Sequence, residues 1–419
     1  MKEKYKILVL SDHALSTSGV GCQTRFLLEG LIKKGNWSFR QFGAAIKHTN
    51  YDVVQVNPDF IIKPIDGFGD RNLIMQSIIS EEPDAIFLFT DPRFFTWLFE
   101  IEDEIREVCP IVYWHVWDNY PFPEYNSPIY KSTDLINCHS HMTYKMVSEK
   151  FPEKTNFIPH SLPEDIFFPI GNSEIKRYKR DILGPGTEEK FVLFWVNRNA
   201  RRKRPNDVLW AWKIFLEKLE SEGHNRDDAI LLMHTDPRDN EGPNLLETAS
   251  ALQITNSVVF SNQRIEFEKM NVLHNISDAC INISYAEGFG LATLESMNCG
   301  KPIIATKTGG LTRQVVDHRD GSENGVALEV RCKSLVGSQG VPYIYEDYID
   351  VNEAADAIYK IYSMPKKERE ALGQKARRYA LSEFGYQKTI DEWDRTMKKA
   401  IEDFKGNNKK RWTLEEVSV

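Results

Sequence analysis

The sequence has few of the features that mark secreted, metal-binding or membrane-anchored proteins. Its six cysteines are scattered, and the closest pair, Cys280 and Cys299, lacks the spacing of zinc ligands. No apolar run approaches the roughly 18 residues of a membrane helix. The first residues lead into a short apolar strand and show no secretory pattern. We therefore expect free thiols, no transmembrane segment and a cytoplasmic location.

Strong charge of one sign is also absent. The formal net charge of −8 comes from 53 basic and 61 acidic residues, which argues weakly against a nucleic-acid duplex as the main partner. No solenoid repeat and no low-complexity tract is visible. At 419 residues, of which 41% are apolar, the chain suits two domains with full hydrophobic cores.

Several catalytic motifs are missing as well. The chain contains no P-loop and no Cys/His nucleophilic pair. The apolar run at residues 6–11, followed by Gly19 and Gly21 and then a helical pattern, opens like a nucleotide-binding fold. It lacks the complete dinucleotide fingerprint and the acidic residue that binds a ribose, which disfavours a dehydrogenase. For Gly21, a ligand contact and a plain strand–helix turn remain equal alternatives.

Residues 284–311 carry the most information. The apolar run at residues 279–283 predicts a buried strand, residues 287–290 a tight turn with two glycines, and residues 291–299 a helix. A glycine-lined turn at a helix N-terminus favours an anionic ligand. The carboxylates of Glu287 and Glu295 would disfavour a bare phosphate but suit hydroxyl groups of a sugar or ribose. The alternative is an ordinary strand–turn–helix with exposed acids.

A basic loop forms the second candidate site. Residues 191–196 predict a fully apolar strand, and the loop that follows contains Arg198 and Lys203. Arg and Lys side chains in such a loop can bind an anionic group such as a phosphate. A solvated basic run, or a nucleic-acid patch over residues 201–204, is the alternative.

Together, Glu287-Gly-Phe-Gly-Leu, Glu295-Ser-Met and the later Gly309-Gly310 resemble the Glu-x7-Glu signature of retaining glycosyltransferases in the GT4-like family, the glycosyl transferases group 1. The resemblance implies an α/β protein of the GT-B fold, with two Rossmann-like domains whose parallel sheets face each other across a cleft. It implies transfer of a sugar from a nucleoside diphosphate sugar, by default of the UDP-glucose type, to a hydroxyl acceptor. It further implies retention at the anomeric carbon and no metal or other cofactor.

The same resemblance assigns roles to individual residues. Glu287 would hold sugar hydroxyls, Glu295 the ribose, and Arg198 with Lys203 the diphosphate. The expected catalytic group is Arg198, Lys203, Glu287 and His115, the last contacting the donor sugar. The expected substrate-binding residues are Gly19, Gly21, Phe289, Gly290, Leu291, Glu295, Arg264 and Asp118, with Arg264 near the base and Asp118 on the acceptor side.

The predicted organisation follows the family. Residues 1–168 form an N-terminal acceptor-side domain, joined by a C-terminal helix at about 386–404; residues 169–190 form a linker, 191–385 the nucleotide-sugar domain and 405–419 a polar tail. The chain departs from the family pattern at Arg204, where a glycine is usual, and at His160-Ser161, where Asn-Gly is usual. Residues 331–345 look like an insertion with Gly337 and Gly340 in a turn.

Other functions remain open at this stage. A catalytically inactive binding subunit, a sugar-nucleotide epimerase and a phosphorylase could use the same scaffold, and residues 201–204 leave room for a nucleic-acid-modifying transferase. The acceptor, whether glycan, lipid, protein or modified nucleic acid, is not specified by the sequence. The donor base, the oligomeric state and the role of the insertion are equally open.

Overall fold

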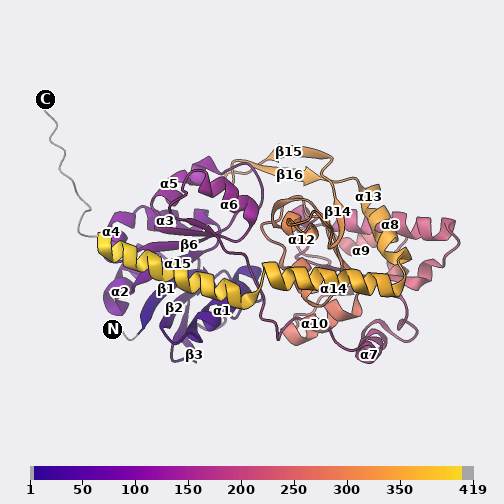
Figure 1. The fold of residues 1–419 in the computed structure, drawn as a ribbon, viewed down its shortest axis with the longest axis horizontal. Coiled ribbons are helices and arrows are strands. Elements are labelled where there is room, and N and C mark those ends of the chain that lie inside the picture. Colours follow the sequence, from indigo (N-terminus) through magenta and orange to yellow (C-terminus); the bar gives the residue numbers. More distant parts are fainter. Residues whose placement is uncertain (1–3, 408–419) are drawn as a thin grey trace. The chain divides into compact units, whose positions relative to one another are not determined.

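The computed structural model describes residues 4–407, which divide into two compact units (Figure 1). Within the described chain, the first unit comprises residues 4–117, 122–160 and 387–407, and the second comprises Asp118–Pro121 and Ser161–Tyr386. The division differs from the predicted one in two places. The change to the second unit falls after His160 and not at residue 168, and the short segment Asp118–Pro121 belongs to the second unit.

The first unit is built on an eight-stranded sheet in the order β3-β4-β2-β1-β5-β6-β7-β8. All neighbouring strands are parallel except β3 and β4. The strands are β1 (Tyr5–Asp12), β2 (Trp37–Ala44), β3 (Val54–Asn57), β4 (Phe60–Pro64), β5 (Ala85–Phe89), β6 (Ile111–His115), β7 (Leu135–Cys138) and β8 (Thr155–Phe157). The central strands β1, β5 and β6 are buried apolar runs, as parallel strands covered on both faces require.

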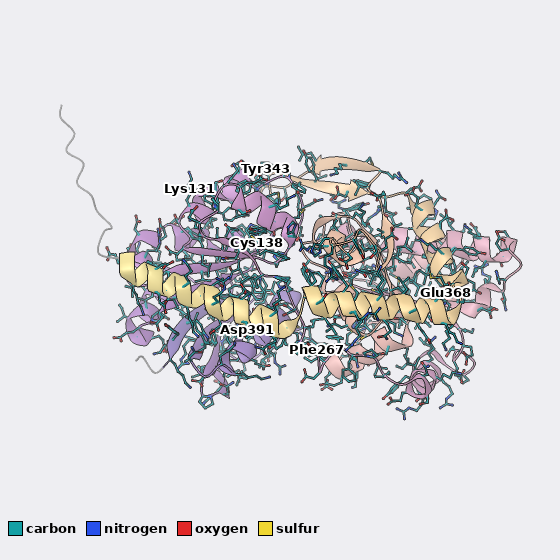
Figure 2. The ribbon with its side chains drawn as sticks, in the orientation of Figure 1. Lys131, Cys138, Phe267, Tyr343, Glu368 and Asp391 are labelled. Carbon is teal, nitrogen blue, oxygen red and sulfur yellow. The ribbon has the colours of Figure 1, made fainter. Side chains whose placement is uncertain are left out.

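Helices cover this sheet on both faces. They are α1 (Gly19–Ile32), α2 (Arg71–Glu81), α3 (Thr96–Phe99), α4 (Glu102–Arg106), α5 (Ser127–Lys131), α6 (His141–Ser148) and α15 (Tyr386–Asn407). The terminal helix α15 packs by Trp393, whose ring lies 5.0 Å from that of Trp114. Asp391, labelled on α15 in Figure 2, forms an ion pair with Lys34. Long-range packing thus brings α15 into the first unit.

The second unit contains a six-stranded, wholly parallel sheet in the order β11-β10-β9-β12-β13-β14. Its strands are β9 (Phe191–Val196), β10 (Ala229–His234), β11 (Val258–Ser261), β12 (Ala279–Asn282), β13 (Ile303–Thr306) and β14 (Gly325–Leu328). Side chains of β9 alternate between the two faces: Phe191 and Leu193 join one hydrophobic cluster, and Val192 and Phe194 the other. A helix layer therefore has to cover each face.

The helices of the second unit are α7 (Asn172–Leu183), α8 (Pro205–Ser221), α9 (Leu245–Ala251), α10 (Phe267–Ile276), α11 (Leu291–Asn298), α12 (Thr312–Val315), α13 (Val351–Ser363) and α14 (Lys366–Glu383). Side chains of α8, α9 and α13 belong to the first cluster, and side chains of α10 to the second. After β14 the chain forms an antiparallel hairpin of β15 (Cys332–Val336) and β16 (Ile344–Tyr348), joined by the turn that contains Gly337 and Gly340 (Figure 1).

Three segments differ from the sequence-based description. Strand β2 has no uninterrupted apolar run, because Ser38, Arg40 and Gln41 lie within it. The Gln41 amide is buried and donates to Ser11 Oγ (2.7 Å) and the Asp12 carbonyl (2.8 Å). The predicted linker contains α7, whose many charged residues hide its helical pattern. The start of the predicted tail continues α15 as far as Asn407, and residues 408–419 lie outside the described residues.

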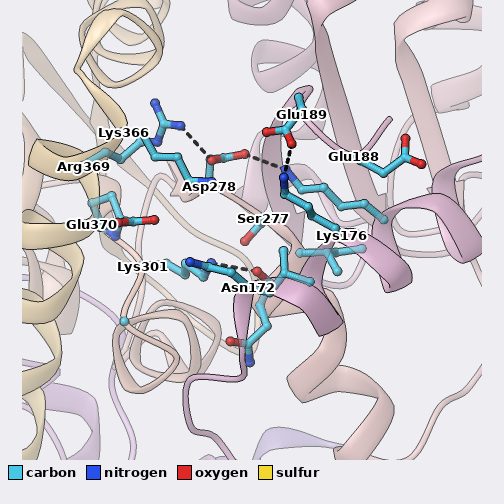
Figure 3. A pocket seen from close by; sticks show the side chains of 16 residues that line it. Asn172, Lys176, Glu188, Glu189, Ser277, Asp278, Lys301, Lys366, Arg369 and Glu370 are labelled. Carbon is cyan, nitrogen blue, oxygen red and sulfur yellow. Dashed lines mark hydrogen bonds and ion pairs between the residues drawn. The ribbon is translucent and has the colours of Figure 1, made fainter. Parts of the chain in front are cut away.

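A pocket of about 100 Å³ lies at the amino-terminal edge of the second sheet, where Asp278 precedes β12 and Lys301 lies near the start of β13 (Figure 3). Asp278 forms ion pairs with Lys179 (3.2 Å) and Arg369 (2.9 Å), and it accepts a hydrogen bond from the Val192 amide. Burial acts to raise the pKa of Asp278, but the two cations outweigh burial and hold the pKa below its ordinary value. This cluster links α7 and α14 to the sheet.

We expect Asp278→Ala to lower the free energy of unfolding by about 3–5 kcal/mol, because it leaves two buried cations without their carboxylate. Denaturant titration measures the effect. Asp181→Ala is the matched control: its partner is Arg180 and both side chains are about half exposed, so we expect a change below about 0.5 kcal/mol. Equal stability of the two variants would contradict a structural role for the Asp278 cluster.

Candidate active site in the second unit

The strand order of the second unit places two loops at one position. Strand β9 lies between β10, which follows it in sequence, and β12, which starts a later part of the chain. The chain therefore leaves β9 and β12 toward opposite sides of the sheet, and their carboxyl ends flank the crevice where open α/β sheets bind ligands. The basic loop after β9 and the glycine-rich loop after β12 both start at this edge.

A buried ion pair joins the two loops. The ammonium group of Lys203, from the 3₁₀ turn Arg201–Lys203, contacts the carboxylate of Glu287, and each residue is only 8% exposed. Burial acts to raise the pKa of Glu287, but Lys203 and then Arg202 outweigh it and keep the pKa below its ordinary value. The Glu287 carboxylate is therefore ionised at neutral pH. Asn282 lies at hydrogen-bond distance (3.4 Å) from the same carboxylate oxygen.

Glycines shape the backbone around Glu287. Gly290 adopts a left-handed conformation (φ 93°) directly before α11, whose first N–H groups have no acceptor within the helix. Gly309 is also left-handed (φ 47°), and a Cβ there would overlap the Glu287 carbonyl oxygen and lie 2.7 Å from the carbonyl oxygen of Asp118. The Gly310 amide donates to the Glu287 carbonyl at 2.9 Å. The conformation of the Glu287 loop therefore depends on close backbone contacts.

The other predicted residues of the motif surround this turn. Phe289 is buried with its ring against Phe384, and its carbonyl accepts a hydrogen bond from Gln314 (2.7 Å). Leu291 is half-buried at the start of α11. The carboxylate of Glu295, one turn further along α11, lies 2.9 Å from Nε2 of the buried His274. The motif thus contains two carboxylates, and each lies next to a basic side chain: Glu287 next to Lys203 and Glu295 next to His274.

The predicted cations differ in their exposure and in the ion pairs that they form within the protein. Arg198 is 64% exposed and makes a two-pronged ion pair with Asp239 (2.8 and 3.1 Å). Arg264 is exposed in the loop between β11 and α10. Arg202 approaches Asp118 at 3.5 Å and donates to the Ala286 carbonyl at 3.3 Å. The structure therefore groups Asp118 with Arg202, Lys203 and Glu287 in one unit.

Arg204 shows why a glycine is usual at its position. Its backbone is left-handed (φ 54°), a conformation that costs little only for glycine. The Arg204 side chain is 4% exposed, pairs with Asp207 (2.7 Å) and lies 4.7 Å above the ring of Tyr285. These contacts offset the backbone cost and anchor the basic loop to the Glu287 loop.

Three predicted residues lie in the first unit. Gly19 is exposed at the start of α1, and Gly21 is buried within the first turn of the same helix. A Cβ on Gly21 would approach the His13 carbonyl oxygen to 2.5 Å, which explains this glycine through packing of the loop before α1. His115 is fully buried, and its Nε2 lies 3.0 Å from the hydroxyl of Tyr130. In residues 4–407, Nδ1 of His115 has no hydrogen-bond partner.

The sequence-based site missed several residues that this geometry brings to the Glu287 loop. Asn119 and Asp347 are buried and hydrogen-bonded to each other beside this loop, and the buried His274 lies next to Glu295 on α11. His234, at the end of β10, could have been noticed from its position, but the other three carry no motif. Among residues 4–407, no cluster of three or more His, Cys, Asp or Glu side chains is arranged to hold a metal ion, and no helix is long and apolar enough to cross a bilayer.

Burial lowers the pKa of His115 to about 3, with a smaller contribution from His139. An unfolded histidine titrates near pH 6.5. Between about pH 6.5 and 3 the unfolded chain therefore binds more protons than the folded chain, and stability falls as the pH falls. His115→Gln removes this effect, so the stability advantage of the wild type over the variant should shrink across that window in denaturant titrations. A difference that stays constant with pH would show that the buried ring titrates normally.

Comparisons with known proteins agree on one family. Residues 177–379 match the family model described as glycosyl transferases group 1. N-acetyl-alpha-D-glucosaminyl L-malate synthase of Bacillus anthracis is 24% identical over 57% of this chain and 58% of its own length. A D-inositol 3-phosphate glycosyltransferase of Corynebacterium jeikeium is 27% identical over 48% of this chain and 46% of its own length. The chain thus spans about half the length of these curated relatives.

Solved structures match over nearly the whole chain. Sucrose-phosphate synthase from Thermosynechococcus elongatus gives a TM-score of 0.74 at 16% identity, covering 96% of this chain and all of its own. Anabaena HepE, in complex with UDP and glucose, gives 0.68 at 16% identity over 94% of this chain and 99% of its own. At such identities the likeness shows the fold. Residues 177–379, which make up most of the second unit, match the glycosyl transferases group 1, and the structural likeness shows that the chain has the GT-B fold.

Proposed function

We propose that the protein transfers a sugar from a nucleoside diphosphate sugar, of the UDP-glucose type, to a hydroxyl acceptor, with retention at the anomeric carbon. The observation that carries this proposal is the buried contact between Lys203 and Glu287 at the switch point of the second sheet. A sugar nucleotide presents hydroxyls and a diphosphate side by side. A carboxylate accepts hydrogen bonds from hydroxyls, and an ammonium group or guanidinium binds phosphate oxygens.

Four of the predicted residues then have a chemical task. Glu287 orients the donor sugar, and Glu295 binds the ribose with its position set by His274. Lys203 and Arg198 stabilise the charge that develops on the diphosphate as the bond from the anomeric carbon breaks. The acceptor oxygen forms its bond on the same face of the sugar, and its proton passes to the leaving diphosphate. This route requires no carboxylate as general base and no metal.

Two observations support a UDP-type donor and the residues beside it. Anabaena HepE, which shares the fold, was solved with UDP-glucose. The exposed loop that carries Arg264 follows β11 at the same carboxyl edge as Glu295, which suits a base and ribose on this side of the sheet. We assign the base to this loop and the sugar to the turn of Phe289, Gly290 and Leu291. Gly19, Gly21 and His115 lie in the first unit. The complete burial of His115 favours a packing role for this side chain.

A panel of nucleoside diphosphate sugars tests the proposal. UDP-glucose should raise the melting temperature of the purified chain more than GDP-mannose does, and an acceptor screen by mass spectrometry should then show the mass of a hexose added. Binding of every sugar nucleotide without transfer to any acceptor would favour an inactive binding subunit. A donor converted to its epimer, with no transfer, would favour an epimerase.

We expect Glu287→Gln to lower turnover at least a hundredfold, because a neutral amide binds sugar hydroxyls and Lys203 less strongly than a carboxylate. Glu383→Gln is a matched control. Its side chain is 11% exposed, as is that of Glu287, and it pairs with Arg313 away from the basic loop. Melting temperatures of the two variants should fall by similar amounts, while only Glu287→Gln loses turnover. Full activity of Glu287→Gln would refute the assigned role.

Gly309→Ala should also impair the reaction, since the added methyl group would push the Glu287 carbonyl from its place. Gly321→Ala provides the control, because Gly321 is likewise left-handed (φ 75°) but a Cβ there meets no atom within 4 Å. Both variants carry the backbone cost of about 1 kcal/mol. We expect the apparent KM for the donor to rise about tenfold or more in Gly309→Ala only. Equal kinetics in both variants would contradict the packing argument.

A further inference from the structure

The hairpin of β15 and β16 buries two neighbouring acids although most of its residues are exposed. In β15, Cys332, Lys333, Ser334 and Leu335 are exposed, whereas in β16 Glu346 is 4% and Asp347 is 3% exposed. Removing carboxylates from water costs several kcal/mol unless partners compensate. The partners of these two acids therefore indicate what the hairpin holds in place.

Glu346 holds the basic loop. Its carboxylate forms an ion pair with Arg201, two residues before Lys203, and accepts a hydrogen bond from the Tyr348 hydroxyl (2.9 Å). The rings of Tyr348 and Tyr285 lie 4.5 Å apart, and Arg204 lies above the Tyr285 ring. One acid of the hairpin is thus tied to the loop that carries the predicted diphosphate ligands.

Asp347 holds a different segment. Its Oδ2 accepts hydrogen bonds from the hydroxyl of Thr308 (2.6 Å) and the side-chain amide of Asn119 (2.8 Å). The amide of Asn119 also donates to the Tyr345 carbonyl (3.0 Å), and the Tyr345 amide donates to the Tyr120 carbonyl (2.7 Å). In the described chain, Oδ1 of Asp347 has no hydrogen-bond partner, and Lys333 lies 3.8 Å from it.

These bonds explain why Asp118–Pro121 belongs to the second unit. The residues on either side, Trp117 and Phe122, belong to the first unit, so the sequence neighbours do not hold the segment there. Asn119 is 2% exposed and makes its side-chain bonds to Thr308 and the hairpin. The hairpin therefore fixes the segment, and with it the carboxylate of Asp118.

Asp118 has a specific neighbour in this position. Its carboxylate lies 3.5 Å from Arg202, a side chain that also feels the charge of Glu287. Without Asp118, the half-exposed Arg202 can turn toward Glu287 and compete with sugar hydroxyls for that carboxylate. We propose that Asp347 is a positioning residue: it fixes Asp118–Pro121 so that Asp118 engages Arg202 and leaves Glu287 available to the donor. The inference rests on the function proposed above.

The test combines Asp347→Ala, Asp118→Ala and the double variant. Each single change should raise the donor KM about tenfold with a smaller change in kcat, because donor binding is what suffers. The double variant should be no worse than either single one, since loss of Asp347 already displaces Asp118. Glu353→Ala is the control: it breaks an exposed ion pair with Arg331 next to the same hairpin and should leave KM unchanged.

A KM of Asp347→Ala equal to that of Glu353→Ala, or effects that multiply to about a hundredfold in the double variant, would overturn the inference. Should Asp347→Ala fail to fold, Asn119→Ala breaks the same link from the other side and should give the same rise in KM. Amide hydrogen exchange gives a readout without turnover. The peptide spanning residues 116–124 should exchange faster in Asp347→Ala than in Glu353→Ala, and equal rates would again overturn the placement.

The two proposals fail in different ways. A wild-type chain that neither binds nor turns over any sugar nucleotide would refute the proposed function, and the exchange comparison would then still decide whether Asp347 holds the segment. A wild-type chain that is active, with an Asp347→Ala variant indistinguishable from the control, would refute the positioning role alone.

Discussion

The contact between Lys203 and Glu287 is the interaction on which the site depends. Two opposite charges at 8% exposure pay a desolvation cost that only close pairing offsets. Neither residue can therefore be buried without the other, and the loops after β9 and β12 must meet. The glycines at 290 and 309 permit that meeting, because their left-handed backbones let the Glu287 loop pack against its neighbours. The pair thus links the sheet topology to the local geometry of the turn.

The features of the site that the sequence could predict are those encoded by local patterns. The strand, turn and helix around Glu287 follow from hydrophobic periodicity and glycine placement, and β12 and α11 appear within a residue of the expected ends. Arg198 and Lys203 could be proposed because their spacing after an apolar strand matches the pattern of the family that the Glu287 motif resembles. Each of these features is encoded within about thirty contiguous residues, where local pattern and structure coincide.

Features that depend on distant partners could not be predicted. Strand β2 was hidden because Gln41 is buried through bonds to Ser11 and Asp12, which lie about thirty residues earlier. The place of Asn119 in the second unit depends on Asp347, more than two hundred residues later. A buried acid of this hairpin carries no sequence motif, because its role is set only by the groups that surround it. Arg204 shows the reverse. Its departure from the family pattern has a local backbone cost, which the local ion pair with Asp207 and the long-range contact with Tyr285 offset.

Arg198 and Lys203, the side chains predicted to bind phosphate, would lose different amounts of free energy on leaving their present ion-pair partners. The partner of Arg198 is Asp239, and the pair is worth at most about 1 kcal/mol because Arg198 is largely exposed. If Lys203 turned to a diphosphate and left Glu287, that carboxylate would lose the cation with which it is in direct contact. A ligand that supplies only phosphates does not replace the lost ion pair of Glu287. A ligand that also brings sugar hydroxyls offers Glu287 new hydrogen-bond donors. On the proposed function, the internal ion pair would therefore favour an intact sugar nucleotide over the nucleotide alone.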